Sequence, residues 1–158
     1  MKLRRLSPRD WATWRDLRLT ALASDPQAFG STLSRERDYD EDRWRELLHP
    51  KWGVKVVAEA PDPVGLVAGV PHEDHDDVLY LYSMWVKPSF RKRGVGEALV
   101  RDVVAWAREH GWRRVQLRVF RGNLAARRLY ERLGFSRVGS PDGSSDGSGG
   151  EVMQLAVS

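Results

Sequence analysis

The chain contains no cysteine, and this absence removes several kinds of chemistry at once. Without a thiol there is no disulfide framework, no thiolate metal site and no cysteine nucleophile, and the composition fits a reducing compartment. No uninterrupted apolar run approaches the roughly 18 residues of a membrane span, and the polar residues after Met1 leave no apolar region for a signal peptide. We therefore expect a cytoplasmic protein with no membrane partner.

Internal repeats and linker-like changes of composition are also missing. The 158 residues, of which 41% are hydrophobic, suffice for one core without disulfides or a structural metal. We expect residues 1–158 to form a single domain. His72 and His75, flanked by acids in an expected loop, are the only residues that suggest a metal site, and we predict no metal there.

Lysine and arginine are absent from residues 56–86, which carry six acids instead. Residues 91–137, in contrast, hold thirteen of the 26 basic residues and only four acids. Such a separation suits an anion at one part of the protein and a cation at another, although two solvated faces give the same pattern. We keep both interpretations open.

Hydrophobic periodicity and turn residues predict alternating strands and helices. The expected strands are residues 2–6, 54–60, 64–70, 78–86, 114–120, 135–139 and 152–157. The expected helices are residues 7–23, 42–49, 97–110 and 123–134. A Gly- and Ser-rich hairpin loop is expected over residues 140–150. This order predicts an α/β sandwich with a mixed sheet.

A basic turn with two glycines follows the third of three consecutive strands. The turn and the helix start comprise Arg91, Lys92, Arg93, Gly94, Val95, Gly96 and Glu97. Glycine lets a backbone N–H approach a ligand oxygen, and the first turn of a helix has unpaired N–H groups with positive partial charge. The turn is typical of a phosphate site, although a basic turn needing only backbone freedom looks the same. Neither the G-x-G-x-x-G fingerprint nor a G-K-[ST] phosphate loop occurs.

Three further segments accompany this turn. They are residues 81–88 (Leu-Tyr-Ser-Met-Trp-Val-Lys-Pro), Asn123-x-x-Ala126-x-x-x-Tyr130, and Leu133-Gly134-Phe135. Together with the R-x-x-G-x-G turn and the element order, they resemble the GNAT superfamily of acetyl-CoA-dependent N-acetyltransferases. The resemblance covers essentially the whole chain. It implies a GNAT-like α/β fold of α+β type, with a mixed, mostly antiparallel seven-stranded sheet, helices on both faces and a splayed central strand pair.

The resemblance implies acetyl-CoA as co-substrate and assigns residues to bind it. These residues are Met84, Trp85, Val86, Arg91, Lys92, Arg93, Gly94, Val95, Gly96, Glu97 and Asn123. Amides at the helix start would bind the pyrophosphate, and the strand edge would pair with the pantetheine arm and stabilise an oxyanion. For Asn123, a helix N-cap without any cofactor contact is the alternative.

Tyr130 is the catalytic residue that the resemblance implies, as the group that protonates the departing thiolate, although a tyrosine that only packs in the core fits the same pattern. The implied reaction moves an acetyl group from acetyl-CoA to a primary amine of a small molecule or peptide by direct attack, with no covalent enzyme intermediate. Some relatives have a glutamate where this chain has Arg118. The general base therefore stays open, with Glu59 and the acids of residues 73–77 as candidates acting through water.

Two other functions fit parts of the sequence. A catalytically degenerate acyl-CoA-binding or sensor protein would keep the phosphate turn without the chemistry. A nucleic-acid-binding module would use the arginine-rich segment, but its basic residues lack an aromatic platform. The acceptor amine, the acyl-chain preference and the oligomeric state stay open, and the resemblance makes a homodimer one state to test.

Overall fold

The computed structural model describes residues 1–120, 122–138 and 150–158. These residues contain a seven-stranded sheet in the order β1-β2-β3-β4-β5-β7-β6. The strands are β1 (Lys2–Arg5), β2 (Val54–Glu59), β3 (Pro63–Pro71), β4 (Val78–Val86), β5 (Arg114–Phe120), β6 (Ser136–Val138) and β7 (Gly150–Ala156). Only β4 and β5 are parallel neighbours, which confirms the expected mixed, mostly antiparallel sheet. Apart from Gly150, the expected loop over residues 140–150 lies outside the described residues.

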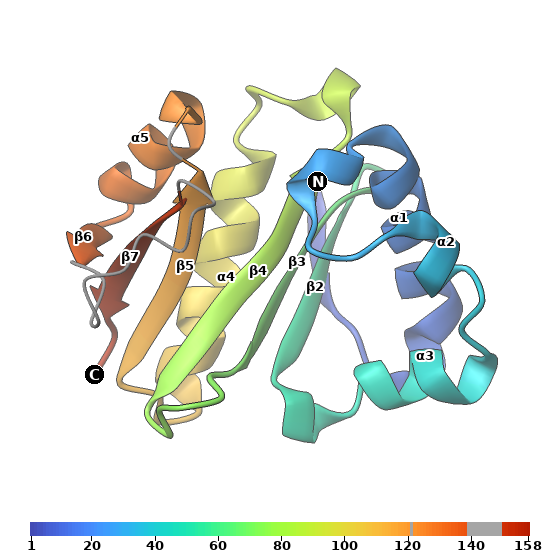
Figure 1. The fold of residues 1–158 in the computed structure, drawn as a ribbon, viewed down its shortest axis with the longest axis horizontal. Coiled ribbons are helices and arrows are strands. Elements are labelled where there is room, and N and C mark those ends of the chain that lie inside the picture. The colour runs from blue at the N-terminus through green and yellow to red at the C-terminus, as the bar shows by residue number, and fades with distance from the viewer. Residues whose placement is uncertain (121, 139–149) are drawn as a thin grey trace.

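Helices cover both faces of the sheet. They are α1 (Trp11–Ser24), α2 (Leu33–Glu36), α3 (Glu41–Leu47), α4 (Val95–Glu109) and α5 (Leu124–Arg132). Figure 1 shows α4 running along one face of the sheet, with α1, α2 and α3 at one end of the molecule and α5 at the other. The one-turn helix α2 was not predicted from the sequence. Among the described residues, no helix combines the length and the hydropathy needed to cross a membrane.

Alternation along the strands assigns the apolar side chains to two cores. Val56 belongs to the core that α4 covers on one face, whereas Val57 belongs to the core that α1 and α3 cover on the other. The buried stripe of α4 includes Leu99 and Val103, which are both fully buried. Because each such side chain contributes roughly 1.5–3 kcal/mol on burial, both faces of the sheet stabilise the fold.

Strands β4 and β5 pair only at their beginnings. Residues 78–80 of β4 lie opposite residues 114–116 of β5, and β4 then continues to Val86 without this neighbour. In the β3–β4 pairing, Ala68 faces Tyr82 but Leu66 faces Trp85, so β4 contains one extra residue. Ser83 lies at this bulge with a left-handed φ of 60°. A bulge bends its strand, and the splayed central pair that the sequence predicted is confirmed.

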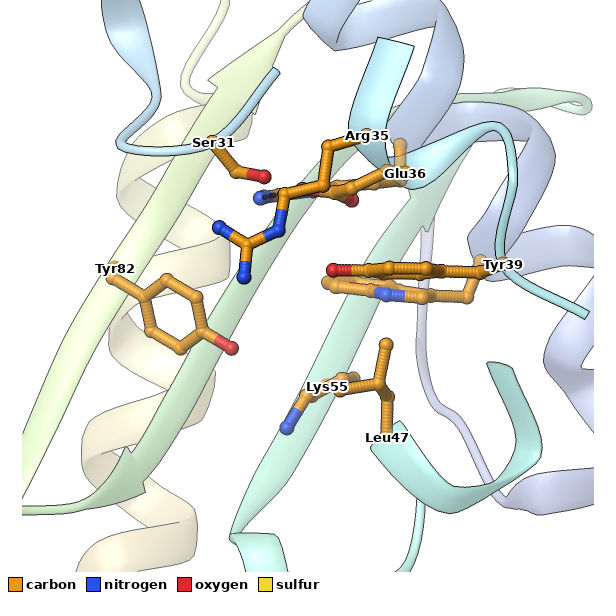
Figure 2. Close-up of a pocket in the computed structure, with 9 residues that line it drawn as sticks. Ser31, Arg35, Glu36, Tyr39, Leu47, Lys55 and Tyr82 are labelled. Carbon is orange, nitrogen blue, oxygen red and sulfur yellow. Dashed lines mark hydrogen bonds and ion pairs between the residues drawn. The ribbon is translucent and has the colours of Figure 1, made fainter. Parts of the chain in front are cut away.

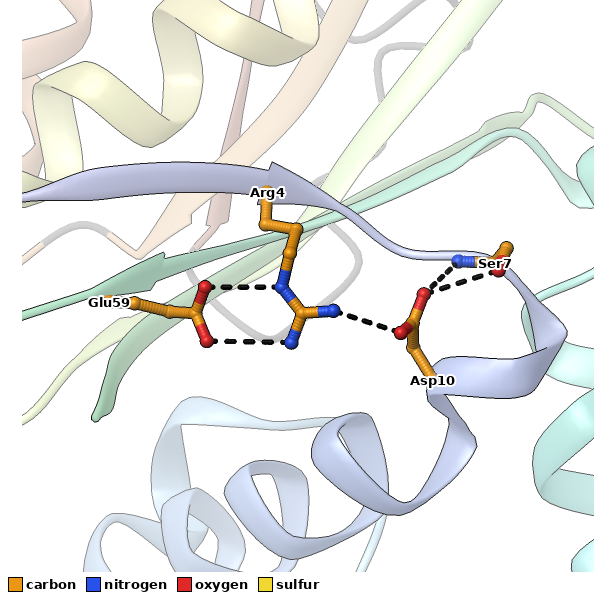
Figure 3. Close-up of polar contacts among 4 residues, drawn as sticks. All are labelled: Arg4, Ser7, Asp10 and Glu59. Atoms are coloured by element: carbon orange, nitrogen blue, oxygen red, sulfur yellow. Dashed lines mark hydrogen bonds and ion pairs between the residues drawn. The ribbon is translucent and has the colours of Figure 1, made fainter. Parts of the chain in front are cut away.

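Arg4 connects β1 to β2 and to the turn that begins α1 (Figure 3). Its Nε donates to Glu59 Oε1 at 3.1 Å, and its Nη1 donates to Asp10 Oδ1 at 2.8 Å. Asp10 also accepts a hydrogen bond from the Ser7 backbone N–H at 2.8 Å, as part of a capping box. One guanidinium therefore bridges carboxylates from two elements.

Replacing Arg4 with methionine leaves both carboxylates without their cation. The side chains of Asp10 and Glu59 are only 22% and 19% exposed, so solvent replaces the lost contacts incompletely. We expect the free energy of unfolding to fall by about 1 kcal/mol, measured by urea denaturation. Arg37→Met, at an exposed arginine with no ion pair to a described residue, is the control. Equal stability of the two variants would contradict this role of Arg4.

Candidate functional site

A cavity of about 840 Å³ lies where β4 and β5 diverge. Its walls come from β4, the start of α4, the end of β5, α5 and the turn after α1. The residues predicted from the sequence that line it are Met84, Trp85, Val86, Arg91, Lys92, Gly94, Val95, Gly96, Glu97, Asn123 and Tyr130. Arg93 is not among the lining residues; its guanidinium lies 5.5 Å from the centre of the Phe90 ring.

The turn between β4 and α4 has an unusual backbone. Lys92 and Gly94 have φ values of 62° and 82°, in the left-handed region. Gly94 is the N-cap of α4, and its carbonyl accepts the hydrogen bond from Ala98 N–H at 3.0 Å. The amides of residues 95–97 precede this bond and have no acceptor within the helix, so they present positive partial charge at the cavity. A phosphate group suits this position.

Gly96 keeps α4 close to β4. A Cβ at this position would lie 3.3 Å from Sδ of Met84, which is tighter than ordinary van der Waals contact. Because the cavity wall is formed by the backbone at this point, a side chain would also fill space that a ligand needs. The close approach of α4 to β4 therefore explains the glycine at position 96, in addition to its place in the motif.

Asp25 joins two predicted site residues and was missed by the sequence analysis. Its Oδ2 accepts from Trp85 Nε1 at 2.7 Å and from Arg91 Nη2 at 2.9 Å. These two hydrogen bonds hold the pKa of Asp25 below its ordinary value, and the bond from Trp85 has the larger effect. Arg91 Nε also donates to the carbonyl oxygen of Val86 at 2.9 Å. The sequence showed Asp25 only as part of an Asp-Pro helix end, and no local pattern links it to residues 60 positions away.

Helix α5 supplies Asn123 and Tyr130. Asn123 Oδ1 accepts from Ala126 N–H at 3.1 Å, so it caps the helix as predicted. The ring of Tyr130 lies edge-on to that of Phe135 at 5.8 Å, and the residue is only 6% exposed. Burial raises the pKa of Tyr130 to about 12. Its hydroxyl has no hydrogen bond to any described residue, so a protonated donor is available at the cavity wall.

The carboxylates considered as general bases lie elsewhere. Glu59 is bound by Arg4 (Figure 3), and Asp77 is bound by Arg114 at 3.0 Å. The acids of residues 73–77 do not line this cavity, whereas Asp25 and Glu97 do. Within the described ranges, no three His, Asp or Glu residues are grouped so that they could hold a metal ion.

A smaller cavity of about 230 Å³ lies on the α1 side of the sheet (Figure 2). Its lining residues are Trp14, Arg18, Ser31, Arg35, Glu36, Tyr39, Leu47, Lys55 and Tyr82. Tyr82, next to the bulge of β4, lines both cavities. Trp44 and Trp52, considered from the sequence as candidates for an acceptor cleft, line neither cavity.

Charged groups are buried around the smaller cavity. Arg18 pairs with Glu36 through two hydrogen bonds of 2.9 and 3.0 Å, and Arg18 also donates to Oγ of Ser83 at the bulge. Lys55 is only 4% exposed, and its Nζ bonds the Trp52 carbonyl oxygen at 3.3 Å but no described carboxylate. Burial, with the charge of Arg18, lowers the pKa of Lys55 to about 8.

Comparison with known proteins agrees with this geometry. Residues 12–135 match the model of the Acetyltransferase (GNAT) family. The chain belongs to the GNAT family. This result confirms the family resemblance found in the sequence.

Curated relatives of this GNAT chain carry acetyltransferase names. N-acetylaspartate synthetase of Rattus norvegicus is 39% identical over 79 residues, which are 50% of this chain and 26% of that protein. An uncharacterized N-acetyltransferase of Methanocaldococcus jannaschii is 36% identical over 114 residues, which are 63% of this chain and 50% of that protein. The chain thus spans between about a quarter and a half of these relatives.

Solved structures show the same GNAT fold. A GNAT acetyltransferase from Streptococcus pneumoniae has a TM-score of 0.80 at 18% identity and covers 99% of both chains. The protein yncA of Salmonella typhimurium, solved with its cofactor acetyl-CoA, has a TM-score of 0.76 at 21% identity and covers 100% of this chain and 94% of its own. The fold class predicted from the sequence is confirmed.

The buried Lys55 predicts that stability depends on pH. Its pKa of about 8 in the folded protein lies below the ordinary value near ~10.4 in the unfolded chain. Between these values the unfolded chain binds one more proton, so stability rises with pH. Relative to Lys55→Met, we expect wild-type stability to increase by about 1 kcal/mol per pH unit from pH 8 to 10.

Urea unfolding of both proteins from pH 6 to 10 measures this difference. Below pH 7 both states of wild type hold the proton, and the difference between the two proteins should be constant. Lys51→Met, at an exposed position, keeps Lys55, so its stability should rise with pH as that of wild type does. A wild-type minus Lys55→Met difference that is flat across the whole range would show that Lys55 has an ordinary pKa.

Proposed function

We propose that the protein moves an acetyl group from acetyl-CoA to a primary amine of a small molecule or peptide by direct attack of the amine. One observation carries this proposal: a single cavity combines a helix N-terminus beside a basic turn, an open strand edge and a buried tyrosine hydroxyl. The neighbour yncA was solved with acetyl-CoA, which supports this co-substrate. Relatives named N-acetyltransferase 8 and N-acetylaspartate synthetase support an amine acceptor.

The cavity fits a molecule with phosphates at one end and amides along its length. Amides of residues 95–97, with Arg91 and Lys92, would bind the phosphates. The edge of β4 beyond Tyr80, which has β3 on one side only, offers backbone groups to the amides of the pantetheine arm. Acetyl-CoA, when bound, supplies an acetyl group already activated as a thioester. Because Gly96 has no side chain, the space beside the start of α4 stays open for this molecule.

Transfer needs a neutral amine nitrogen to bond the acetyl carbon while the carbon–sulfur bond breaks. The nitrogen then loses a proton, and the sulfur leaves with negative charge until it gains one. Tyr130 is the group that we assign to this sulfur. Because its pKa of about 12 exceeds the ~8.5 of a thiol, its hydroxyl stabilises the charge chiefly as a hydrogen-bond donor. No covalent bond to the protein is required.

Removing the Tyr130 hydroxyl tests the chemistry. In Tyr130→Phe the packing against Phe135 is kept, so we expect acetyl-CoA affinity to stay within about twofold while kcat falls roughly 100-fold or more. Thiol release over a panel of polyamines, aminoglycosides, amino acids and peptides gives kcat, and mass spectrometry checks the gain of one acetyl group. Tyr80→Phe, on the same sheet but outside both cavities, is the control. Unchanged turnover in Tyr130→Phe would remove this residue from the chemistry.

Adding bulk at Gly96 tests the cofactor assignment. An indole at this position meets Met84 and fills the cavity beside the α4 N-terminus, so Gly96→Trp should weaken acetyl-CoA binding more than about 10-fold. Isothermal titration calorimetry measures the affinity without any acceptor. Arg108→Trp places the same ring on an exposed position in the last turn of α4 and should bind normally. Equal affinity of both variants would place acetyl-CoA elsewhere.

A further inference from the structure

The smaller cavity carries an excess of positive charge. Its lining residues include three basic side chains, Arg18, Arg35 and Lys55, and one acidic side chain, Glu36. Arg18 and Glu36 satisfy each other through two hydrogen bonds, with side-chain exposures of 9% and 6%. The pocket therefore contains two cations, Lys55 and Arg35, that have no carboxylate partner among the described residues.

Strand register places Lys55 and Tyr82 on the floor of this pocket. Lys55 pairs with Ala68 of β3, and Ala68 pairs with Tyr82 of β4, so the three side chains form one row on the same face. The methyl group of Ala68 is short, which leaves the space between its two long neighbours open. Figure 2 shows Arg35 reaching from α2 over this row, with Tyr39 beside it.

Burying Lys55 without a carboxylate partner lowers the stability of the fold. A cation that has lost water and gained only one neutral acceptor destabilises the fold, and the Arg18 charge adds repulsion. A bound anion would supply the missing partner and reverse the effect on the Lys55 pKa. A purely cationic acceptor, such as a polyamine, would instead meet Lys55 and Arg35 as like charges.

We propose that this cavity is the acceptor site and that it takes a free amino acid, whose carboxylate is bound by Lys55 and Arg35. The amine would then face β4 near Tyr82, which lines both cavities. A space of about 230 Å³ holds roughly eight water volumes of ~30 Å³, which is the size of an amino acid rather than of a folded partner. This proposal rests on the acetyl transfer proposed above.

Paired acceptors test the role of the carboxylate directly. The full chain is assayed with acetyl-CoA and each standard amino acid beside its decarboxylated amine, by thiol release and product mass. We expect at least one amino acid to be acetylated with a kcat/KM more than about 10-fold above that of its decarboxylated partner. The comparison uses wild-type protein only, so it does not depend on the folding of a variant.

Lys55→Met then tests which residue binds the carboxylate. It should raise the KM for the preferred amino acid about 10-fold, leave the KM for acetyl-CoA within twofold and reduce the preference over the decarboxylated amine. Lys51→Met, at an exposed lysine that lines neither cavity, should change none of these values. An unchanged preference in Lys55→Met would overturn the assignment of Lys55.

The wild-type panel also separates this proposal from the proposed function. If no amino acid is acetylated faster than its decarboxylated partner, the amino-acid acceptor is wrong. Acetylation of any other amine in that case leaves the transferase assignment standing. If no amine gains an acetyl group and acetyl-CoA does not bind saturably, both proposals fall.

Discussion

The separation of β4 from β5 is the constraint on which the site depends. The two strands pair over residues 78–80 and 114–116, and beyond these residues β4 has only β3 beside it. Backbone N–H and C=O groups that lose a neighbouring strand need another partner, because leaving them buried and unpaired costs free energy. The same separation creates the larger cavity and brings the start of α4 to its edge. An open sheet edge and a helix N-terminus thus share one space.

The bulge at Ser83 also decides which side chains face which cavity. In a regular strand, residues 82 and 84 would lie on one face and residue 85 on the other. The extra residue resets this alternation, so that Tyr82 and Trp85 both face α1, whereas Met84 and Val86 face α4. Trp85 can therefore bond Asp25 at the end of α1. One extra residue in β4 therefore allows neighbouring residues of this strand to contact both α1 and α4.

Local pattern explains what the sequence could predict. The seven strands follow from runs of apolar and β-branched residues between turn residues, and the basic turn follows from its glycines and the helix after it. Helix α2 was not predicted because four residues are too few to show a helical period. Its start is marked by Thr32, whose side chain accepts a hydrogen bond from Arg35 N–H at 3.2 Å. The role of Asp25 was not predicted because its partners, Trp85 and Arg91, lie 60 and 66 residues away in the sequence. The local sequence does not show that Lys55 is buried, because residues of α1, α2 and α3 cover its face of the sheet.

Charge shows most clearly why segment composition is a poor guide to a site. The acids of residues 56–86 suggested a region that attracts an amine, yet Glu59 is taken by Arg4 and Asp77 by Arg114, and neither lines a cavity. Solvent and salt weaken the effect of the exposed acids of residues 73–76 over about 10 Å. Lys55, by contrast, is surrounded by protein, where an electrostatic interaction is several times stronger than in water. For the proposed acceptor, a single buried cation would therefore matter more than a run of acids that line neither cavity.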